Sequence, residues 1–253
     1  MNLTPLAWHR RFKQQAGWSQ QIRHHLYERA GLQTAQRVLD VGSGTGVLEE
    51  EIQSITAGQI HAIDINFSYL RFALASSSQN SYPTLGDAQD LPYNDSLFDI
   101  TFCHFVLLWL SNPVKAIKEM VRVTRTGGSI LALAEPDYGG RIDFPPELEL
   151  LGHWQQRALQ DQGADPFMGR KLAGLFNQVG LVNVEWGVLG GQWHTHFDDE
   201  EWNIEWTLLR SDLASIGLEQ DLNHFQRLDL SAFHEGKRVL FVPTFYAWGL
   251  KPK

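Results

Sequence analysis

The stretch "RVLDVGSGTGVLEEEI", Arg37 to Ile52, decides the fold class of this chain. It begins with a short apolar run, passes through glycines at alternate positions, Gly42, Gly44 and Gly46, and ends in a segment with helical spacing. Glycine permits backbone angles and a close approach that any side chain would block. A strand, a glycine loop and a helix in this order therefore predict a place where a ligand lies against the backbone.

Outward from this stretch, short apolar segments alternate with helical ones. We expect strands at 37–41, 59–64, 81–85, 98–103 and 129–135, and helices at 46–54, 67–77 and 112–124. Strands that alternate with helices of this size predict a mostly parallel sheet covered on both faces. The fold class is therefore α/β, doubly wound.

The segments on either side of this pattern are more helical. Residues 6–30 read as a helix in one or two pieces around Gly17, with Trp18, Ile22, Leu26 and Ala30 on one apolar face. "TRTGG" (124–128) is expected to end the preceding helix with its glycine. Further along we expect the following elements: helices at 145–160, at 166–178 (capped by Asp165, with Pro166 in its first turn) and at 198–216, and strands at 182–196 and 239–250.

Length and composition predict one domain over residues 1–253. Its expected parts are an N-terminal helical cap at 1–36, a core at 37–136, and a C-terminal half at 137–253 that carries a helical insertion and forms the substrate side. No apolar run approaches the roughly 18 residues of a membrane span. The net charge is −8, and no basic stripe suits a nucleic acid. We therefore expect a small-molecule partner. Cys103 is the only cysteine, so we expect a cytoplasmic protein.

The glycine loop does not have the spacing of the phosphate-binding loops. A dinucleotide fingerprint reads G-x-G-x-x-G, whereas here the spacing is G-x-G-x-G and Val47 stands where the third glycine should be. A P-loop requires a lysine, and none occurs in 38–54. A purely structural turn remains open on the loop alone.

Acidic residues follow the next two expected strands. Asp64 ends the second strand, where a carboxylate can accept the hydroxyls of a ribose. Asp87 and Ala88 follow the third strand, where an acid beside a backbone N–H can read an adenine edge. Three strand ends with this chemistry in this order indicate an adenosine-containing ligand.

The segments "VLDVGSGTG", "AIDIN", "GDAQDLPYNDSLFDITFC" and "GG" before "SILALAEP" resemble the motifs of class I S-adenosylmethionine-dependent methyltransferases. The resemblance is strongest to their small-molecule branch (methyltransferase type 11, UbiE-like), and it covers roughly residues 37–136. It implies a seven-stranded Rossmann-like sheet whose last strand is antiparallel, and S-adenosylmethionine as cofactor, released as S-adenosylhomocysteine. The residues that it implies around the cofactor are Asp40, Gly42, Ser43, Gly44 and Gly46 for the methionine part, Asp64 and Ile65 for the ribose, Asp87 and Ala88 for the adenine, and Cys103 and His104 below the sulfonium.

Candidate substrate residues follow the fourth and fifth strands. His104 could orient an acceptor or deprotonate it, or could simply bond to a neighbouring loop. Trp109, Glu135, Asp137, Tyr138 and Arg141 are the remaining candidates, although the acids and the arginine could equally be paired with one another. His194, His196 and Asp198 have too few convincing partners for a metal site, and no metal is expected.

These features favour methyl transfer to a small organic acceptor by in-line displacement, with carbon, nitrogen or oxygen as the acceptor atom left open. Such a reaction needs alignment and exclusion of water more than a protein nucleophile. Two alternatives remain: a protein of the same fold that binds the cofactor without catalysis, and a nicotinamide-dependent oxidoreductase. The sequence gives no indication of the oligomeric state.

Overall fold

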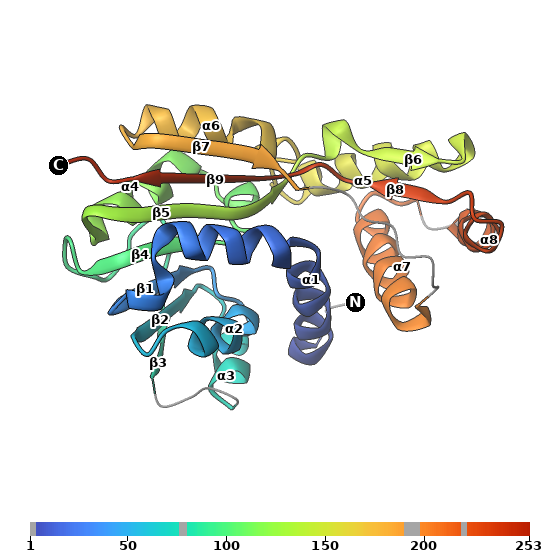
Figure 1. Ribbon diagram of the computed structural model, residues 1–253. Coiled ribbons are helices and arrows are strands. Elements are labelled where there is room, and N and C mark those ends of the chain that lie inside the picture. Colours follow the sequence, from blue (N-terminus) through green and yellow to red (C-terminus); the bar gives the residue numbers. More distant parts are fainter. Residues whose placement is uncertain (1–3, 76–79, 190–197, 219–221) are drawn as a thin grey trace.

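The central element of the fold is a seven-stranded sheet with the strand order β3-β2-β1-β4-β5-β9-β7 (Figure 1). The computed structural model describes residues 4–75, 80–189, 198–218 and 222–253. β9 runs antiparallel to both of its neighbours, and the pairs from β3 to β5 are parallel, which confirms the expected doubly wound topology. The strands of this sheet are β1 (Arg37–Val41), β2 (Gln59–Asp64), β3 (Ser81–Leu85), β4 (Phe98–Cys103), β5 (Thr124–Pro136), β7 (Val182–Val188) and β9 (Thr244–Leu250).

Helices cover both faces of the sheet. On one face lie α1 (Pro5–Ala30), the short η1 (Leu32–Thr34), α2 (Val47–Ile55) and α3 (Phe67–Leu74). On the other face lie α4 (Pro113–Val123) and α6 (Met168–Gln178). The remaining helical segments are η2 (Leu107–Trp109), η3 (Tyr138–Gly140), η4 (Pro146–Leu148), α5 (Glu149–Asp161), α7 (Asp199–Ala214) and α8 (Leu222–His234).

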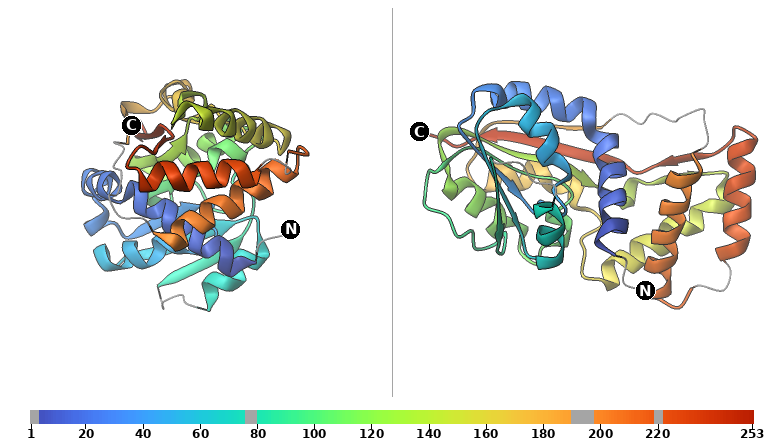
Figure 2. Two further views of the ribbon diagram at one scale, coloured as in Figure 1. Left: turned by 90° about the vertical axis from the view of Figure 1, so that its right-hand side faces the viewer. Right: turned by 90° about the horizontal axis from the view of Figure 1, so that it is seen from below.

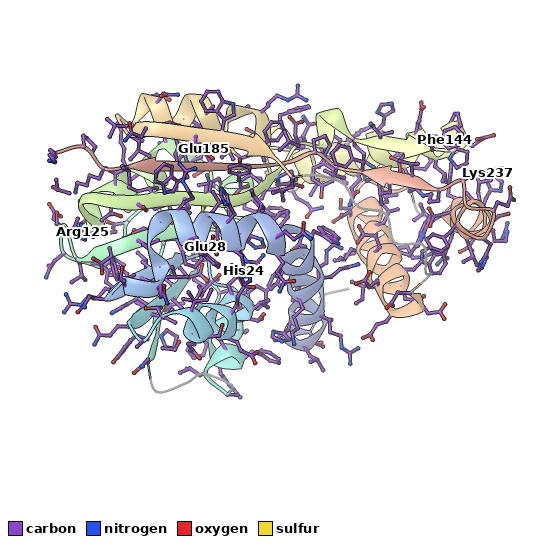
Figure 3. The ribbon with its side chains drawn as sticks, in the orientation of Figure 1. His24, Glu28, Arg125, Phe144, Glu185 and Lys237 are labelled. Atoms are coloured by element: carbon purple, nitrogen blue, oxygen red, sulfur yellow. The ribbon has the colours of Figure 1, made fainter. Side chains whose placement is uncertain are left out.

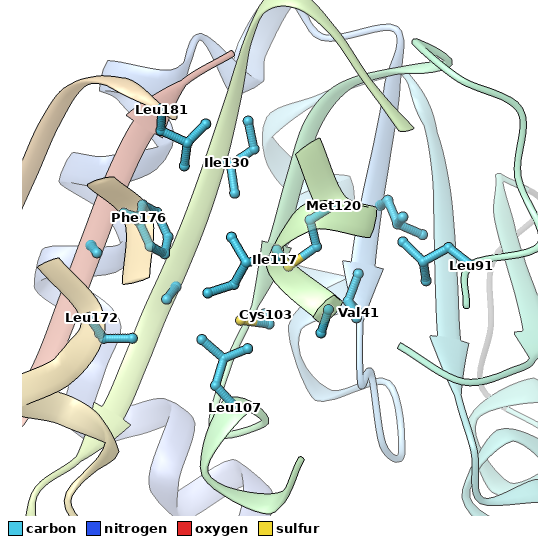
Figure 4. Packing of buried hydrophobic residues seen from close by; sticks show 14 of the residues in the cluster. Val41, Leu91, Cys103, Leu107, Ile117, Met120, Ile130, Leu172, Phe176 and Leu181 are labelled. Atoms are coloured by element: carbon cyan, nitrogen blue, oxygen red, sulfur yellow. The ribbon is translucent and has the colours of Figure 1, made fainter. Parts of the chain in front are cut away.

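Alternate side chains of the strands form two separate apolar cores. Leu39 and Val41 of β1 pack toward α4 and α6 in the cluster shown in Figure 4, together with Cys103 of β4. Val38 of β1 and Phe102 of β4 pack on the opposite face, against α1 and α2. Because side chains alternate along a strand, Asp40 falls on the α1 side and Cys103 on the α4 side. This alternation decides which candidate residues can meet.

A helical unit extends from the end of the sheet at which β5 and β7 finish (Figures 1 and 2). It contains α5, α7 and α8 around a third apolar cluster that includes Leu148, Trp206 and Leu213. A two-stranded ribbon of β6 (Ile142–Phe144) and β8 (Val239–Phe241) belongs to it. Phe144 and Lys237 lie at its far end in Figure 3. The expected insertion is thus present, and α8 and the ribbon are elements that the sequence did not indicate.

The N-terminal segment is assigned as a single helix, α1, which bends partway along its length (Figures 1 and 2). Leu26 is buried as expected, but Trp18 is 49% exposed, so its place on the buried face was wrong. Arg11 lies over the Trp18 ring at 4.8 Å, which explains how this indole is held at the surface. The buried stripe passes instead through Ala16, Ser19 and Arg23.

Two expected element ends were also wrong. "TRTGG" does not end α4 with a glycine cap, because α4 ends at Val123 and the chain enters β5 at once. Gly127 and Gly128 lie within β5, where the register against β4 shifts. A Cβ at Gly128 would lie 2.7 Å from the carbonyl oxygen of Asp99, so the glycine serves close packing of strands.

The C-terminal stretch 239–250 forms two strands in different sheets, where one was expected. Pro243 lies between them, and it has no N–H to offer a ladder. Its carbonyl oxygen accepts a hydrogen bond from the backbone of Asp137, so the chain is anchored where it changes sheets.

Two further ends differ at the start of α6 and at the end of β7. Asp165 accepts the N–H of Phe167 in a turn that contains Pro166, and α6 begins only at Met168. β7 ends at Val188, whereas a strand to 196 was expected, and most of the remainder of that stretch lies outside the described residues.

Candidate functional site

The glycine loop joins β1 to α2 with all three of its glycines at positive φ. The φ angles of Gly42, Gly44 and Gly46 are 74°, 56° and 78°. A Cβ at Gly42 would lie 2.4 Å from a methyl carbon of Val106, and one at Gly44 would lie 3.0 Å from the ring of Phe12. Both the angles and the contacts therefore require glycine. The loop is enclosed by the segment after β4 and by α1.

Asp64 at the end of β2 holds the loop in place. Its two carboxylate oxygens accept the backbone N–H groups of Gly44 at 2.8 Å and of Asn66 at 2.7 Å. Burial raises the pKa of this carboxyl, and the backbone hydrogen bonds partly offset the effect. Each carboxylate oxygen can accept a further hydrogen bond. Asp64 thus organises the loop and can still accept the hydroxyls of a ligand.

A second carboxylate, Asp40, lies beneath the loop without a partner. It is only 2% exposed, yet it makes no hydrogen bond or ion pair with any described residue. Burial raises its pKa well above the ordinary value, the neighbouring Glu49 and Asp64 raise it further, and the charge of Arg23 acts in the opposite direction. An unpaired buried carboxylate is costly unless a ligand supplies its counter-charge.

Glu49 and Ser43 add two more unsatisfied atoms at this place. Glu49 accepts a hydrogen bond from Ser81 through one carboxylate oxygen, while the other is buried without a partner among the described residues. Ser43 Oγ is likewise buried and unpartnered. Glu49 was missed in the sequence analysis. It lies three residues after Gly46, in the first turn of α2, so its side chain can reach the glycine loop. The loop thus offers hydrogen-bond acceptors and acids that a cationic ligand would favour in their ionised form.

The ends of β2 and β3 expose apolar side chains next to each other. Ile65 is 74% exposed and Leu85 is 56% exposed, and the register pairs Leu85 with Asp64. Asp87 accepts the N–H of Gln89 at 2.8 Å, and Ala88 packs against the α4-side core. A flat apolar ring can rest on the first pair of residues while polar edges meet the Asp87 loop.

Cys103 is the last residue of β4 and His104 follows it, and their side chains lie on opposite sides of the sheet. The Cys103 thiol is buried in the α4-side core, and burial raises its pKa well above the ordinary value. The His104 imidazole lies under α1, where Nε2 is 2.8 Å from Ser19 Oγ. Burial lowers the pKa of His104 to about 3, with Arg23 acting in the same direction. The imidazole is therefore neutral at physiological pH.

Glu135 is fully buried, and its carboxylate accepts hydrogen bonds from backbone N–H groups. Its carboxylate accepts the N–H groups of Val106 at 2.8 Å, Leu107 at 2.7 Å and Leu108 at 3.2 Å. These bonds fasten η2 to the end of β5, and they leave Trp109 about half exposed at its tip. Burial raises the pKa of Glu135 to about 7 despite the three donors. Glu135 thus supports the segment that crosses Gly42, and its contact with a substrate stays a prediction.

Asp137, Tyr138 and Arg141 diverge after β5. The buried Asp137 accepts a hydrogen bond from Arg170 at 2.7 Å. Arg141 is paired with Asp143 at 2.6 Å inside the helical unit. The hydroxyl of Tyr138 makes no hydrogen bond to any described residue. Its pKa is raised by burial, with opposing influences from nearby charges that include Arg11 and Glu205.

Several polar contacts of this region were missed by the sequence reading. Arg11 of α1 pairs with Glu205 of α7, which ties the N-terminal helix to the helical unit. Arg238 bridges Asp143 at 2.9 Å and also contacts Asp229. Within the described residues no cluster of three potential metal ligands occurs, and His194 and His196 lie outside them. No helix in the described ranges has the length and apolar character required to cross a membrane.

Comparison with known proteins identifies the central part of the chain. Residues 39–132 match the family model described as a methyltransferase domain. The ubiquinone/menaquinone biosynthesis C-methyltransferase UbiE of Vibrio campbellii is 34% identical over 122 residues, which cover 44% of this chain and 47% of that protein. The chain therefore matches about half the length of this curated relative.

Solved structures extend the likeness to nearly the whole chain. A Haemonchus contortus phosphoethanolamine N-methyltransferase in complex with S-adenosyl-L-methionine superposes with a TM-score of 0.60 at 14% identity, covering 92% of this chain and 53% of that one. The [4+2]-cyclase SpnF superposes with a TM-score of 0.58 at 19% identity, covering 92% and 81%. At these identities the likeness establishes the fold, and the second protein shows that one fold serves different reactions. Residues 39–132 of this chain thus match the methyltransferase domain family, and they lie within a sheet that superposes on those of solved methyltransferase structures.

Proposed function

We propose that this protein transfers a methyl group from S-adenosylmethionine to a small organic acceptor. The observation that carries the proposal is the unpaired Asp40 carboxylate beneath the glycine loop, close to Glu49 and Asp64. S-adenosylmethionine has an ammonium and a sulfonium group. Both are positively charged and could supply the counter-charge that Asp40 lacks among the described residues. A dinucleotide would bring a negatively charged diphosphate to three carboxylates, so the acidic loop counts against the nicotinamide alternative.

The residues present fit this cofactor part by part. Asp40, Ser43 and the backbone of Gly42, Gly44 and Gly46 would hold the methionine portion, with Asp40 facing the ammonium. Asp64 and Ile65 would hold the ribose, and Asp87 and Ala88 the adenine, which the exposed Ile65 and Leu85 would cover. His104 would lie next to the reacting centre, while Cys103 would contribute only packing from the opposite face.

When bound, S-adenosylmethionine supplies a methyl group that is already activated for transfer. The protein then has to align the acceptor and exclude water, a task that can contribute about 7–11 kcal/mol. The segment 106–109, fixed by Glu135, and the N-terminal helix α1 enclose the glycine loop from two sides. This enclosure is what alignment requires.

We place the acceptor between α1, the loop after β5 and the helical unit. The Tyr138 hydroxyl, which makes no hydrogen bond to a described residue, lies there near the Arg11–Glu205 ion pair. Trp109, Glu135, Asp137 and Arg141 stay candidate substrate residues. We expect residues 1–253 to act as one domain with a cap at 1–36, a core at 37–136 and a substrate side at 137–253, in the cytoplasm, without nucleic acid or membrane partners.

The test is calorimetric titration with S-adenosylmethionine, S-adenosylhomocysteine and NAD in turn. We expect binding of the two sulfur compounds and none of NAD. Asp40→Asn should weaken S-adenosylmethionine at least tenfold, because a charge-assisted contact in a buried site contributes about 1.5–3 kcal/mol. Glu50→Gln removes the same charge from the exposed side of α2 and should leave the affinity unchanged. Binding of NAD alone would overturn the proposal, and equal affinities in the Asp40→Asn variant would overturn the assigned role.

An acceptor screen with radiolabelled methyl then separates an enzyme from a binding protein. Product formation that Asp40→Asn abolishes supports methyl transfer. Cofactor binding without product over a broad set of carboxylates, phenols and amines would favour the binding-protein alternative.

A further inference from the structure

The side chain of His104 is anchored to the N-terminal helix and not to the sheet from which it comes. β1 and β4 pair in parallel with Val41 opposite Cys103, so His104 lies beside Gly42 at the start of the glycine loop. From there its Nε2 reaches Ser19 Oγ on α1 at 2.8 Å. No described residue makes a hydrogen bond to its Nδ1. One nitrogen of the ring is thus used by the fold, and the other is available.

The hydrogen bonds around Ser19 determine which atom is the donor. Arg23 Nη1 lies 2.7 Å from Ser19 Oγ, and a guanidinium can only donate, so Ser19 accepts that bond. The hydroxyl hydrogen of Ser19 then has two acceptors in reach, the carbonyl oxygen of Ala16 at 3.5 Å and Nε2 of His104 at 2.8 Å. A distance of 3.5 Å is long for a hydroxyl donor, whereas 2.8 Å is ordinary. We assign the hydroxyl hydrogen to the shorter of these two contacts, so that Ser19 donates to Nε2 of His104.

Arg23 is itself fixed in this role. It is almost fully buried, and it donates to the carbonyl oxygen of Ala16 at 2.7 Å and from Nε to Glu51 at 2.8 Å. A second guanidinium nitrogen also contacts Glu51. A buried arginine with these partners has little freedom to release Ser19. His24 lies 3.8 Å from Glu51 on the outer side of the same helix, and its position on α1 is visible in Figure 3.

We propose that Ser19 fixes His104 as the neutral tautomer with its hydrogen on Nδ1, so that His104 acts as a hydrogen-bond donor toward the reacting groups and not as a base. The donor role toward an acceptor rests on the proposed function, whereas the tautomer does not. Ser19 and Arg23 are positioning residues in this scheme. The acceptor would present a lone pair to Nδ1–H, and its nucleophilic atom would arrive with no proton for His104 to remove. Carboxylates and readily ionised phenols or enols have this chemistry.

The surroundings of His104 support a permanently neutral ring. Its lowered pKa has two causes, burial first and the charge of Arg23 on α1 second. Phe105 packs edge-on against the ring at 4.7 Å and brings no charge. Two acids lie close to Arg23: the carboxylate of Glu51 is engaged by its guanidinium, and Asp40 is near enough for Arg23 to oppose the rise of its pKa. A base at this position would need a free nitrogen lone pair, and the one lone pair of the Nδ1–H tautomer is bonded to Ser19.

The test is nitrogen NMR of protein labelled with ¹⁵N-histidine, which reports directly which ring nitrogen carries the hydrogen. The His104 signals are assigned by their loss in His104→Gln. We expect the Nδ1–H pattern in the wild type, unchanged from pH 5 to pH 8. A wild-type spectrum with the hydrogen on Nε2, or a titration of His104 within this range, would overturn the proposal.

Variants of Ser19 separate a positioning role from a merely structural one. Ser19→Ala should produce a mixture of both tautomers and raise the pKa of His104, and Ser19→Thr, which keeps the hydroxyl, should restore the wild-type pattern. Ser231→Ala removes an exposed hydroxyl on α8 and should change neither signal. An unaltered His104 spectrum in a folded Ser19→Ala protein would contradict the role of Ser19. If Ser19→Ala does not fold, the wild-type and Ser19→Thr spectra still decide the tautomer.

Addition of S-adenosylhomocysteine places the donor relative to the cofactor. At a saturation verified by calorimetry, we expect the Nδ1 signal to move and the His24 signal to stay. No movement at full saturation would show that Nδ1–H does not face the reacting centre. Absence of binding would instead contradict the proposed function, and the tautomer measurement would stand unaffected.

Discussion

Replacing Glu135 by glutamine should stabilise this protein at alkaline pH, although it removes an acceptor for three backbone donors. Glutamine has the shape of the protonated acid, with one carbonyl oxygen and one donor group. The variant therefore imitates the state that burial favours. The pKa of Glu135 is raised from 4.5 to about 7, and since one pKa unit corresponds to about 1.4 kcal/mol, ionised Glu135 lowers the free energy of unfolding by about 3 kcal/mol.

The sign follows from proton binding. An unfolded chain releases the Glu135 proton near pH 4.5, whereas the folded protein retains it to about pH 7. Between these values the folded state holds more protons, so the wild-type stability should fall as the pH rises through this window. Glu135→Gln has no such proton to lose. Its stability should match the wild type near pH 4.5 and exceed it by about 3 kcal/mol at pH 8.

Urea unfolding at half-unit steps from pH 5 to pH 8, monitored by tryptophan fluorescence, measures this difference. Other raised carboxyls, Asp40 among them, contribute the same slope to both proteins and cancel in the comparison. Glu50→Gln on the exposed side of α2 serves as the charge-matched control and should follow the wild type throughout. A Glu135→Gln protein that is less stable than wild type at pH 8 would refute the reasoning, because the hydrogen bonds would then outweigh burial.

Three further outcomes are expected. The affinity for S-adenosylmethionine should fall by up to tenfold per pH unit below the raised pKa of Asp40, because the cationic ligand needs the ionised carboxylate. A constant affinity in calorimetry from pH 5 to pH 8 would contradict this. Asp143→Ala leaves Arg141 and Arg238 as buried charges without their shared partner, so it should lower the free energy of unfolding by about 3–5 kcal/mol in urea. A decrease below about 1 kcal/mol would show that both arginines find other partners. Gly44→Ala forces a left-handed alanine against an aromatic ring and should cost about 1–2 kcal/mol and weaken cofactor binding, both measurable by thermal shift with and without the ligand.

The strands β1 to β4 could be predicted to the residue because each ends in a chemical signal. β1 and β2 are apolar runs that finish at a glycine loop and at Asp64, and burial on both faces makes such runs continuous. The signal fails where a strand continues through glycine, as β5 does at Gly127, or where proline divides one apolar run between two sheets, as at Pro243. In both places the sequence pattern is that of an ordinary strand, and the pairing with neighbouring strands decides where the strand begins or ends.

The candidate site divides along the same line. The glycine loop and Asp64 lie close enough in sequence for their residue types and spacing to indicate a ligand site. Ser19 and Arg23 are polar residues on the buried stripe of α1, and their spacing from Ala16 could have marked them as buried. Their partner His104, however, is 85 positions from Ser19. No local rule supplies such a pairing, because it depends on where α1 is laid on the sheet.

This division also bears on which acceptor the protein uses. The family match ends at residue 132, before every candidate acceptor contact that follows β5, and it begins after α1. The matched part contains the loop, Asp64 and His104, whereas Ser19, Arg11 and Tyr138 all come from outside it. The names of relatives that match over that part therefore inform the cofactor and not the acceptor. The tautomer of His104 connects the cofactor site with the acceptor site. His104 belongs to the matched domain, but its tautomer is set by Ser19 on α1, which lies outside that domain.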